Sequence, residues 1–523
     1  MENKILKVTD LSIGFEENKQ FTEVVKKISF DVGQGEIVGI VGESGSGKSL
    51  TSLTIMDLLS HTAKVNNGSI LFEDKDLLTI STEEKRKLKG KDISMVFQEP
   101  MTSLNPLLKV GPQVEEVLVL HKDGDRNSYR KRVISMFQDV GLPNPEELYE
   151  KYPHQLSGGM RQRVMIAMAM ILQPKLLIAD EPTTALDVTI QKQILDLLLK
   201  MNQKYGTSII FISHDLGVVK KLCNRVIVMC EGEIVEQGQI ATIFTNPKEA
   251  YTKKLLAAVP SVKANEAFGE IAVTAAEKKS SPVLSVKDLK VSYKVKSKGL
   301  FKKAEEKRIV KGVSFTVNEG EIFGIVGESG CGKSTLSKAI VGLNRHTEGV
   351  LELKEANPQM VFQDPYSSLN PAKTIGAILS EPLIIEGKLT SRQRMEKVEQ
   401  MLEEVGLPKD YYKRNIAKLS GGQRQRVAIA LALMTNKKFI VLDEPVSALD
   451  VTIQDQILRL LKRLREEYNL SYLFISHDLN VVYELCDRIA VMKDGVIVEQ
   501  GTKDEIYYRP KADYTKQLLS AIL

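Results

Sequence analysis

The sequence predicts an α/β protein made of two similar halves, on the strength of three observations. A glycine-rich stretch ending in lysine and serine follows a short apolar run at residues 42–49, and the same arrangement returns at 327–334. Each half also has a short apolar segment that ends in two adjacent acids. From the middle of each half onward, matching motifs keep a constant spacing of 263 residues, as between Ser157 and Ser420. The chain therefore repeats one fold twice.

Composition sets broad limits on the class of protein. The 523 residues are 43% apolar and 27% charged, which is typical of a globular protein with a large core. No apolar run approaches the roughly 18 residues of a membrane span, and the first residues lack the apolar core of a signal peptide. A net charge of +5 does not by itself indicate nucleic-acid binding. We expect a cytoplasmic protein whose four cysteines, none in a C-x-x-C pair, are buried thiols rather than a disulfide or metal site.

The first glycine-rich stretch predicts a phosphate-binding loop. Residues 36–41 suit a buried parallel strand, and residues 49–59 continue with helical spacing. Glycines allow successive backbone N–H groups to turn toward a polyanion, and the following helix offers its positive end. Lys48 would reach the β- and γ-phosphates, while the Ser49 hydroxyl would hold magnesium. The alternative, an ordinary Gly/Ser-rich surface turn, is disfavoured because the stretch recurs after residues 321–326.

The two halves differ in the segments that flank their glycine-rich loops. The first half has extra residues after its loop, and the second half has an insertion before its loop. About twenty extra residues of the first half include Ser81–Glu84, a capping box that predicts a short charged helix through Lys89. The second half instead carries a basic insertion at residues 294–303. We expect this insertion to be a solvated turn between strands; contact with an anionic membrane is the alternative.

Acids and histidines follow later strands in both halves. Residues 176–182 form an apolar strand that ends in Asp180 and Glu181, at the sheet edge where α/β proteins bind ligands. Asp180 would help to hold magnesium, and Glu181 would orient or deprotonate a water aimed at the γ-phosphate. His214 closes another strand; a structural histidine is the alternative to a γ-phosphate sensor. Asp443, Glu444 and His477 repeat the set.

The sequence at this point resembles the ATP-binding cassette (ABC) family, and the resemblance covers nearly the whole chain. The family's signature stands at residues 156–163 and again at 419–426. Ser-Gly-Gly at a helix start makes a second phosphate clamp. The resemblance implies two tandem ABC nucleotide-binding domains, each a P-loop NTPase core with an antiparallel β subdomain and a helical signature subdomain. It also implies that each signature completes the other half's site, so that Lys48 faces Ser420 and Lys333 faces Ser157.

The resemblance assigns roles residue by residue. Adenine would stack on Phe15 and Tyr293, whose alternative is a core aromatic on an edge strand; Asp187 and Asp450 resemble the interdomain loop. The catalytic residues are Glu181, Glu444, His214 and His477. The ATP-binding residues are Phe15, Gly42, Ser44, Gly45, Gly47, Lys48, Ser49, Ser157, Gly158, Gly159, Tyr293, Gly327, Ser329, Gly330, Gly332, Lys333, Ser334, Ser420, Gly421 and Gly422. The Mg²⁺ residues are Ser49, Gln98, Asp180, Ser334, Gln363 and Asp443. Because both halves keep the full set, we predict two hydrolytic sites.

The predicted domains are residues 1–259 and 284–523, each with a C-terminal extension, joined by a linker at 260–283. The linker has a mixed, weakly periodic composition. As a flexible coil its two dozen residues would span on the order of 25 Å, which would let the halves pack together.

Two stretches resemble the ATPases of oligopeptide, dipeptide and nickel importers. One follows each glutamine, at residues 98–106 and 363–371; the other ends each half, at 246–256 and 509–519. The resemblance implies a fused pair of ATPases at the cytoplasmic face of a bacterial membrane, bound peripherally to two permeases and served by an extracytoplasmic solute-binding protein. No nucleic acid partner and no iron–sulfur centre are expected.

Other functions remain open at this point. Within importers, peptides are the leading cargo, with glutathione, a nickel or other metal chelate, or an opine-like solute as alternatives. Outside them, ribosome-associated tandem cassettes typically have a long charged helical connector, whereas this linker is short. A DNA-repair ATPase would need zinc-binding cysteine pairs, which the sequence lacks. An exporter with a separate ATPase is the remaining alternative.

Overall fold

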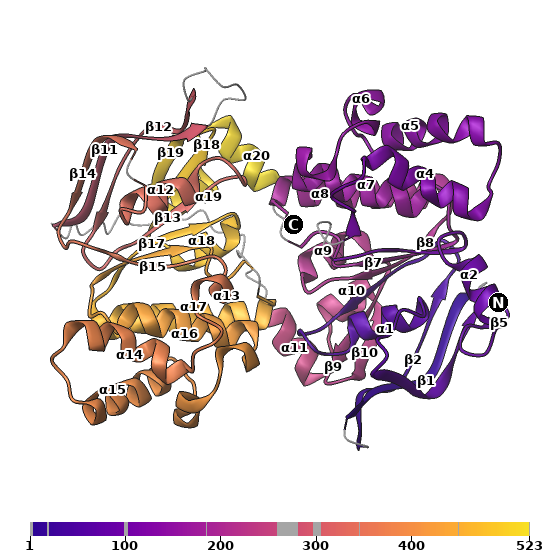
Figure 1. Cartoon of the computed structure of the whole chain (residues 1–523), viewed down its shortest axis with the longest axis horizontal. Coiled ribbons are helices and arrows are strands. Elements are labelled where there is room, and N and C mark those ends of the chain that lie inside the picture. Colours follow the sequence, from indigo (N-terminus) through magenta and orange to yellow (C-terminus); the bar gives the residue numbers. More distant parts are fainter. Residues whose placement is uncertain are drawn as a thin grey trace.

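The computed structural model describes residues 4–17, 20–98, 103–184, 186–258, 281–295, 305–344, 346–447 and 449–521. Two bodies of the same architecture lie side by side in Figure 1. Each has an antiparallel sheet, a mostly parallel core sheet and surrounding helices. The predicted α/β class with two repeated units is therefore confirmed.

An antiparallel sheet begins each half. The first has the order β2-β1-β4-β5, and the second has the order β12-β11-β14. In the first half, the apolar face of the antiparallel sheet packs against the core sheet. Val8 of the antiparallel sheet and Ile40 of the core sheet are therefore buried in one cluster. The strands are β1 (Lys4–Glu17), β2 (Gln20–Gly33), β4 (Ala63–Phe72), β5 (Lys75–Asp76), β11 (Pro282–Val295), β12 (Glu305–Asn318) and β14 (Thr347–Leu353).

The core sheet of the first half has the order β10-β9-β3-β8-β7-β6, with only β10 antiparallel to its neighbour. Its strands are β3 (Ile37–Val41), β6 (Ile93–Val96), β7 (Leu176–Asp180), β8 (Ser208–Ile212), β9 (Arg225–Cys230) and β10 (Glu233–Gln239). Because parallel strands end at one edge, the segments that follow β3, β7 and β8 come together there.

The second half repeats this sheet in the order β19-β18-β13-β17-β16-β15. Its strands are β13 (Ile322–Val326), β15 (Gln359–Val361), β16 (Phe439–Asp443), β17 (Ser471–Ser476), β18 (Arg488–Lys493) and β19 (Val496–Thr502). The central strands are buried along their whole length, which explains why they are continuous apolar runs.

Helices cover the core sheets and form a separate layer in each half. In the first half they are α1 (Lys48–Ile55), α2 (Thr82–Leu88), α4 (Val110–His121), η1 (Arg126–Ser128), α5 (Tyr129–Asp139), α6 (Pro145–Tyr149), η2 (Pro153–Gln155), α7 (Gly158–Met170), α8 (Val188–Tyr205), α9 (Leu216–Leu222), α10 (Ile240–Thr245) and α11 (Ala250–Ala257). In the second half they are α12 (Lys333–Ile340), α13 (Pro365–Ser368), α14 (Ile375–Glu386), α15 (Ser391–Glu404), η3 (Lys409–Lys413), η4 (Ile416–Lys418), α16 (Gly421–Leu433), α17 (Val451–Tyr468), α18 (Leu479–Leu485), α19 (Lys503–Tyr508) and α20 (Asp513–Ala521).

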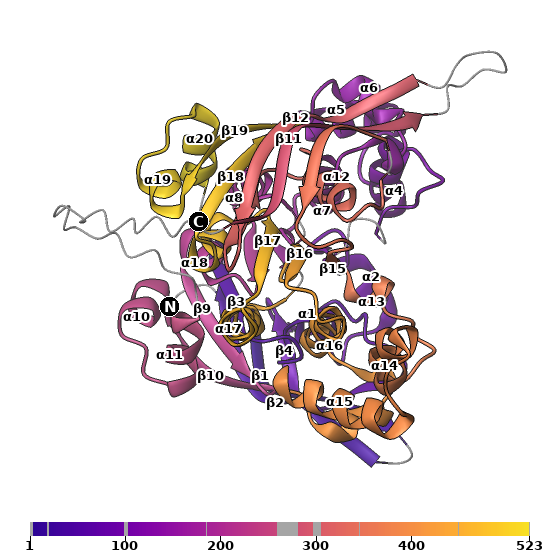
Figure 2. The same ribbon diagram turned by 90° about the vertical axis from the view of Figure 1, so that its left-hand side faces the viewer.

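The C-terminal extensions of the two halves lie on the same side of the molecule. Figure 2 shows α10 and α11 below α19 and α20 on that side, while α4, α5, α14 and α15 lie on the other. No helix in the described part of the chain is long and apolar enough to cross a membrane.

Two sequence predictions about elements have different outcomes. The capping box at Ser81–Glu84 is present and starts α2. The helix predicted over residues 49–59 ends instead at Ile55. Asp57 takes a left-handed conformation (φ 49°), and the Leu58 N–H returns to the Leu53 carbonyl at 2.8 Å, which terminates the helix.

The regions between elements are only partly described. The predicted linker at 260–283 lies outside the described residues up to 280, and β11 begins at Pro282, so the domain limits remain predictions. The basic insertion at 294–303 lies outside them from residue 296 on. Three of the four cysteines are buried free thiols, as expected, whereas Cys230 is only half-buried.

Candidate active sites

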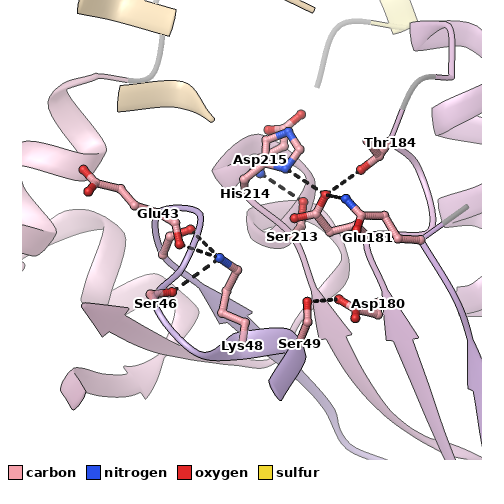
Figure 3. A network of polar contacts seen from close by, with 12 residues as sticks. Glu43, Ser46, Lys48, Ser49, Asp180, Glu181, Thr184, Ser213, His214 and Asp215 are labelled. Atoms are coloured by element: carbon pink, nitrogen blue, oxygen red, sulfur yellow. Dashed lines mark hydrogen bonds and ion pairs between the residues drawn. The ribbon is translucent and has the colours of Figure 1, made fainter. Parts of the chain in front are cut away.

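The first phosphate-binding loop lies between β3 and α1, as its sequence predicts. Gly47 caps the helix with φ 96°, and a Cβ on Gly42 would lie 2.1 Å from the Met229 carbonyl oxygen. Both positions therefore require glycine. The Lys48 side chain curls back, and its Nζ donates to the carbonyls of Gly42 and Glu43, both at 2.8 Å (Figure 3).

The second loop, between β13 and α12, has the same geometry. Lys333 Nζ donates to the carbonyls of Gly327 at 2.7 Å and Glu328 at 2.9 Å. Burial lowers the pKa of Lys48, and the charges of Glu181 and, from the other half, Asp450 oppose that shift. In both halves, the loop lysine thus donates from its Nζ to two backbone carbonyls of its own loop.

Next to each loop, a serine hydroxyl meets a buried aspartate. Ser49 Oγ donates to Asp180 Oδ1 at 3.1 Å, and Ser334 Oγ donates to Asp443 Oδ1 at 3.2 Å. Burial raises the pKa of Asp180 to about 6, and it also raises that of Asp443. A buried carboxylate whose pKa is raised in this way gains from a nearby cation.

These donors fit magnesium. Hydroxyl, carboxylate and amide oxygens are the hard ligands that Mg²⁺ takes alongside phosphate oxygens. No group of three or more His, Cys, Asp or Glu side chains in the described ranges could form a complete metal cage. The oxygen donors of each half are nevertheless of the chemical type that Mg²⁺ prefers.

Glu181 follows Asp180 in a strained conformation. Its φ is +46°, and its N–H donates to the Ile212 carbonyl at 3.0 Å. The carboxylate accepts from Gln98 at 2.9 Å and from Thr184 at 2.8 Å, and it lies 3.3 Å from His214 Nδ1 (Figure 3). Left-handed backbone at a non-glycine residue costs about 1–2 kcal/mol and is typical of functional positions.

Glu181 and His214 shift each other's pKa in opposite directions. Burial alone would raise the pKa of Glu181, but the hydrogen bond and positive charge of His214 outweigh it and lower that pKa to about 2. Burial would lower the pKa of His214, and the Glu181 carboxylate reverses this and raises it. Glu181 is therefore a carboxylate at neutral pH, and its charge favours the protonated form of His214.

The second half repeats the cluster with one difference. Glu444 has φ +47°, and its carboxylate accepts from Gln363 at 3.0 Å and contacts His477 Nδ1 at 3.1 Å. His477 lowers the pKa of Glu444 against the effect of burial. At the place of Thr184 stands Ser447, whose hydroxyl donates to the backbone carbonyl of Glu444 at 3.2 Å.

The signature serines lie at helix starts, as predicted. Ser157 caps α7 by accepting the Met160 N–H at 3.3 Å, and Ser420 caps α16 in the same way. Gly158, Gly159, Gly421 and Gly422 open these helices. From the first half, the cavity around Lys333 is lined by Thr184, Leu186 and Asp187, and Ser157 is not among its lining residues. That Ser157 faces Lys333 therefore remains a prediction. The same holds for Ser420 and Lys48.

The two predicted adenine-stacking aromatics differ in exposure. Tyr293, on β11, is 41% exposed and lines the cavity around Lys333, which has a volume of about 590 Å³. An aromatic ring with an open face beside a phosphate loop suits a stacked base. Phe15 is half-buried on β1. Neither residue is on an edge strand, because β1 and β11 both lie between two neighbours.

The first half reaches directly into the second half's loop. The Asp187 carboxylate accepts the N–H of Ser329, and Thr189 Oγ1 donates to Glu328 Oε1 at 2.9 Å. The sequence predicts an interdomain role for Asp187, but it does not single out Thr184 or Thr189. Their only signal is proximity to Asp187 and the acid pair.

Two protein-family models match parts of this chain. A family model described as ABC transporter matches residues 25–184 and 310–447, ranges that contain both loops and both acid pairs. A second model, described as Oligopeptide/dipeptide transporter, C-terminal region, matches residues 235–281, which include α10 and α11. The second extension, at 509–519, lies outside that match.

Full-length relatives are also similar to the chain. It is 44% identical to the peptidoglycan transport ATP-binding protein YejF of Agrobacterium fabrum, over 99% of this chain and 96% of the relative. It is 41% identical to the glutathione import ATP-binding protein GsiA of Pectobacterium atrosepticum, over 100% of this chain and 90% of the relative. A solved archaeal ribosome recycling factor, in complex with a ribosomal stalk protein, matches with a TM-score of 0.62 over 95% of this chain and 90% of that chain. At 21% identity, its likeness concerns the fold alone.

Proposed function

Because the chain belongs to the ABC transporter family, whose ATP-binding cassettes are ATPases, we propose that ATP hydrolysis at its two sites powers the import of peptides through a pair of membrane permeases. The observation that carries this proposal is the duplicated cluster of lysine, serine–aspartate pair, left-handed glutamate and histidine at the sheet edge, in a chain that also matches the oligopeptide/dipeptide C-terminal region.

Each residue of the cluster has a role in hydrolysis. Lys48 and Lys333 bind the β- and γ-phosphates. Glu181 and Glu444 accept the proton of the attacking water as its oxygen bonds to the γ-phosphorus and ADP leaves. His214 and His477 hold these carboxylates in place and donate to the γ-phosphate.

Oxygen donors of this chain would hold magnesium beside the phosphates. Ser49, Asp180 and Gln98 supply them in the first half, and Ser334, Asp443 and Gln363 in the second. When bound, Mg²⁺ neutralises charge on the β- and γ-phosphate oxygens. Gln98 and Gln363 also contact the catalytic glutamates, so they link nucleotide state to the segments that follow them.

Exposed apolar side chains follow both glutamine segments along the chain, and they support the proposal that permeases dock on this part of each half. Leu107 is 82% exposed and Leu108 48% exposed, close after Gln98, and Ile385 on α14 is 86% exposed. Large apolar side chains that gather at a surface often mark a protein contact. We place the chain peripherally on the cytoplasmic face of the membrane, with an extracytoplasmic solute-binding protein delivering cargo to the permeases.

Two other functions are weighed against peptide import. Import of glutathione by the same mechanism is the first, since GsiA carries that name at 41% identity; nickel or other metal chelates and opine-like solutes are further cargoes of this kind. A ribosomal role is the second, and it rests on a likeness of fold alone. We favour import because relatives that cover the whole chain are named for transport.

Uptake assays test the proposal. Cells without the chain should lose uptake of radiolabelled di- and oligopeptides; the intact chain should restore it, and a Glu181→Gln/Glu444→Gln double variant should not. The tagged chain, captured from gently solubilised membranes, should bring two polytopic proteins with it. Loss of glutathione uptake alone would assign the other cargo, whereas ribosomal proteins without a polytopic partner would overturn import.

A further inference from the structure

A tyrosine from each C-terminal extension touches the start of its phosphate-binding loop. The Glu43 N–H donates to the hydroxyl of Tyr251, on α11, at 3.2 Å. The Glu328 N–H donates to the hydroxyl of Tyr514, on α20, also at 3.2 Å. Burial raises the pKa of both tyrosine hydroxyls, so both stay protonated and neutral. The two halves thus build the same contact independently.

This contact acts on the peptide group that also holds the loop lysine. The Glu43 N–H and the Gly42 carbonyl belong to one planar peptide unit. Tyr251 accepts from its N–H while Lys48 Nζ donates to its carbonyl at 2.8 Å. Hydrogen bonds on opposite ends of one amide polarise each other and fix the orientation of its plane.

The same peptide unit is held in the second half. Tyr514 accepts the Glu328 N–H, and Lys333 Nζ donates to the Gly327 carbonyl at 2.7 Å. The surroundings of the two tyrosines otherwise differ. Lys493 Nζ lies over the Tyr514 ring, 4.6 Å from its centroid. The matching residue in the first half is Cys230, which carries no charge to make this contact. What the halves share is therefore the hydroxyl–peptide–lysine chain itself.

The tyrosines are held rigidly by the core sheet. Glu236 on β10 accepts the N–H groups of Lys248 and Glu249, at 2.9 and 3.2 Å, immediately before α11. Glu499 on β19 accepts those of Lys511 and Ala512, at 2.7 and 3.0 Å, immediately before α20. A carboxylate that accepts two backbone N–H groups fixes a helix start strongly. Each extension helix therefore presents its tyrosine at a defined position.

We propose that Tyr251 and Tyr514 are positioning residues for ATP binding: each holds the first peptide of its loop so that Lys48 or Lys333 is oriented toward the phosphates. The extension is then part of the nucleotide site, in addition to any role at the membrane. This inference rests on the ATP-binding part of the proposed function and is independent of the cargo.

ATP affinity measured at one site at a time tests the inference. In a full-length Lys48→Ala background, binding reports the Lys333 site. Tyr514→Phe keeps the ring and removes the hydroxyl, and it should raise the Kd for ATP about three- to ten-fold, the effect of losing one hydrogen bond. Tyr507→Phe, in the same extension, is the matched control, because its hydroxyl donates to Asn480 at 3.3 Å and the first half has Phe244 at this position.

The mirror experiment uses Tyr251→Phe in a Lys333→Ala background, and it should give the same shift. In the otherwise intact chain, each Tyr→Phe variant should raise the KM for ATP more than it lowers kcat, whereas a general loss of stability would reduce kcat through the fraction of folded protein. Unchanged affinity in both Tyr→Phe variants would overturn the inference, and so would an equal loss in Tyr507→Phe. Peptide uptake is not part of the readout, so a failure here leaves the import proposal to its own test.

Discussion

At the scale of single residues, Glu181 and Glu444, the proposed catalytic glutamates, have a strained backbone. Glu181 and Glu444 precede prolines, and a residue before proline normally prefers extended backbone. Both instead have positive φ, 46° and 47°. The conformation is maintained because each N–H donates across the sheet, to Ile212 and Ile475, and because each carboxylate is bound by a glutamine and a histidine. These contacts hold each carboxylate beside its glutamine and histidine.

We predict that Glu181→Gln and Glu444→Gln each lower ATP turnover strongly, because loss of a positioned general base slows hydrolysis about 10²–10⁴-fold at its own site. Glutamine keeps the shape and the Gln98 or Gln363 contact but cannot take the proton. Near-full turnover in either variant would show that site to be silent.

Glu231→Gln is the matched control for these substitutions. Glu231 also has positive φ, 48°, but it is exposed in the turn between β9 and β10. Turnover should be unchanged in this variant, which separates loss of the catalytic proton acceptor from a general cost of replacing a left-handed glutamate.

The sequence predicts the identity of these site residues but not their conformation. Spacing after apolar strands brings Lys48, Asp180 and His214 to one edge, because parallel strands end together. The left-handed glutamate depends on bonds to β8 and to Gln98, which are distant in the chain. Such tertiary bonds override the local preference of the residue before proline.

At the scale of elements, the helical layer is tied to the core by the ends of its helices. Asp139, the last residue of α5, accepts from Lys204 Nζ and from Tyr205 Oη, both at 2.7 Å, at the end of α8. The second half uses Glu404 and Tyr468 at the same place. Local sequence predicts some element ends, such as the capping box of α2, but it misses others. The early end of α1 depends on Asp57, whose carboxylate is bound by Lys85 of α2 and by Lys89 just after that helix, both far along the chain.

Asp139→Asn should lower the free energy of unfolding at pH 7 by about 1 kcal/mol, the net worth of a charged hydrogen bond in a partly exposed site. Burial would raise the pKa of Asp139, but the bonds from Lys204 and Tyr205 lower it below its usual range. A lowered pKa means that the stabilisation is present above the unfolded value, near 4, and is lost as pH falls through the folded value.

Urea unfolding midpoints at several pH values between 7 and 3.5 check this prediction. The difference between the parent and Asp139→Asn should be largest at neutral pH and should shrink below about pH 4. Asp196→Asn, at an exposed position on α8, is the control and should change the midpoint little at any pH. A pH-independent difference would mean that packing, and not charge, holds α5 to α8.

At the scale of the whole molecule, the two halves meet through α8 and the second loop. Thr189 and Asp187 contact Glu328 and Ser329, and Lys192 Nζ on the same helix donates to the Ser520 carbonyl of α20 at 3.2 Å (Figure 1). The repeat and the resemblance predict that the halves pair, but these contacts join residues more than 130 positions apart. Sequence spacing alone could not identify them.

The interface is not symmetric at the level of hydrogen bonds, and this difference can be tested. Thr452 occupies the place of Thr189 in the second half, yet its buried hydroxyl has no hydrogen-bond partner in the described part of the chain. Replacing a bonded hydroxyl by a methyl group costs about 1 kcal/mol, whereas replacing an unpaired buried hydroxyl is neutral or favourable. The two equivalent threonines thus differ in whether the side-chain hydroxyl is hydrogen-bonded.

Thr189→Val should therefore lower kcat/KM for ATP about three- to ten-fold, because the loop residue Glu328 loses its link to the other half. Thr452→Val keeps the same change of shape and should leave kcat/KM within about two-fold of the parent while thermal stability stays equal or rises. Steady-state ATPase assays and thermal unfolding of both variants measure this. Equal losses in the two variants would mean that the sites close alike and that the Thr189–Glu328 bond does not distinguish them.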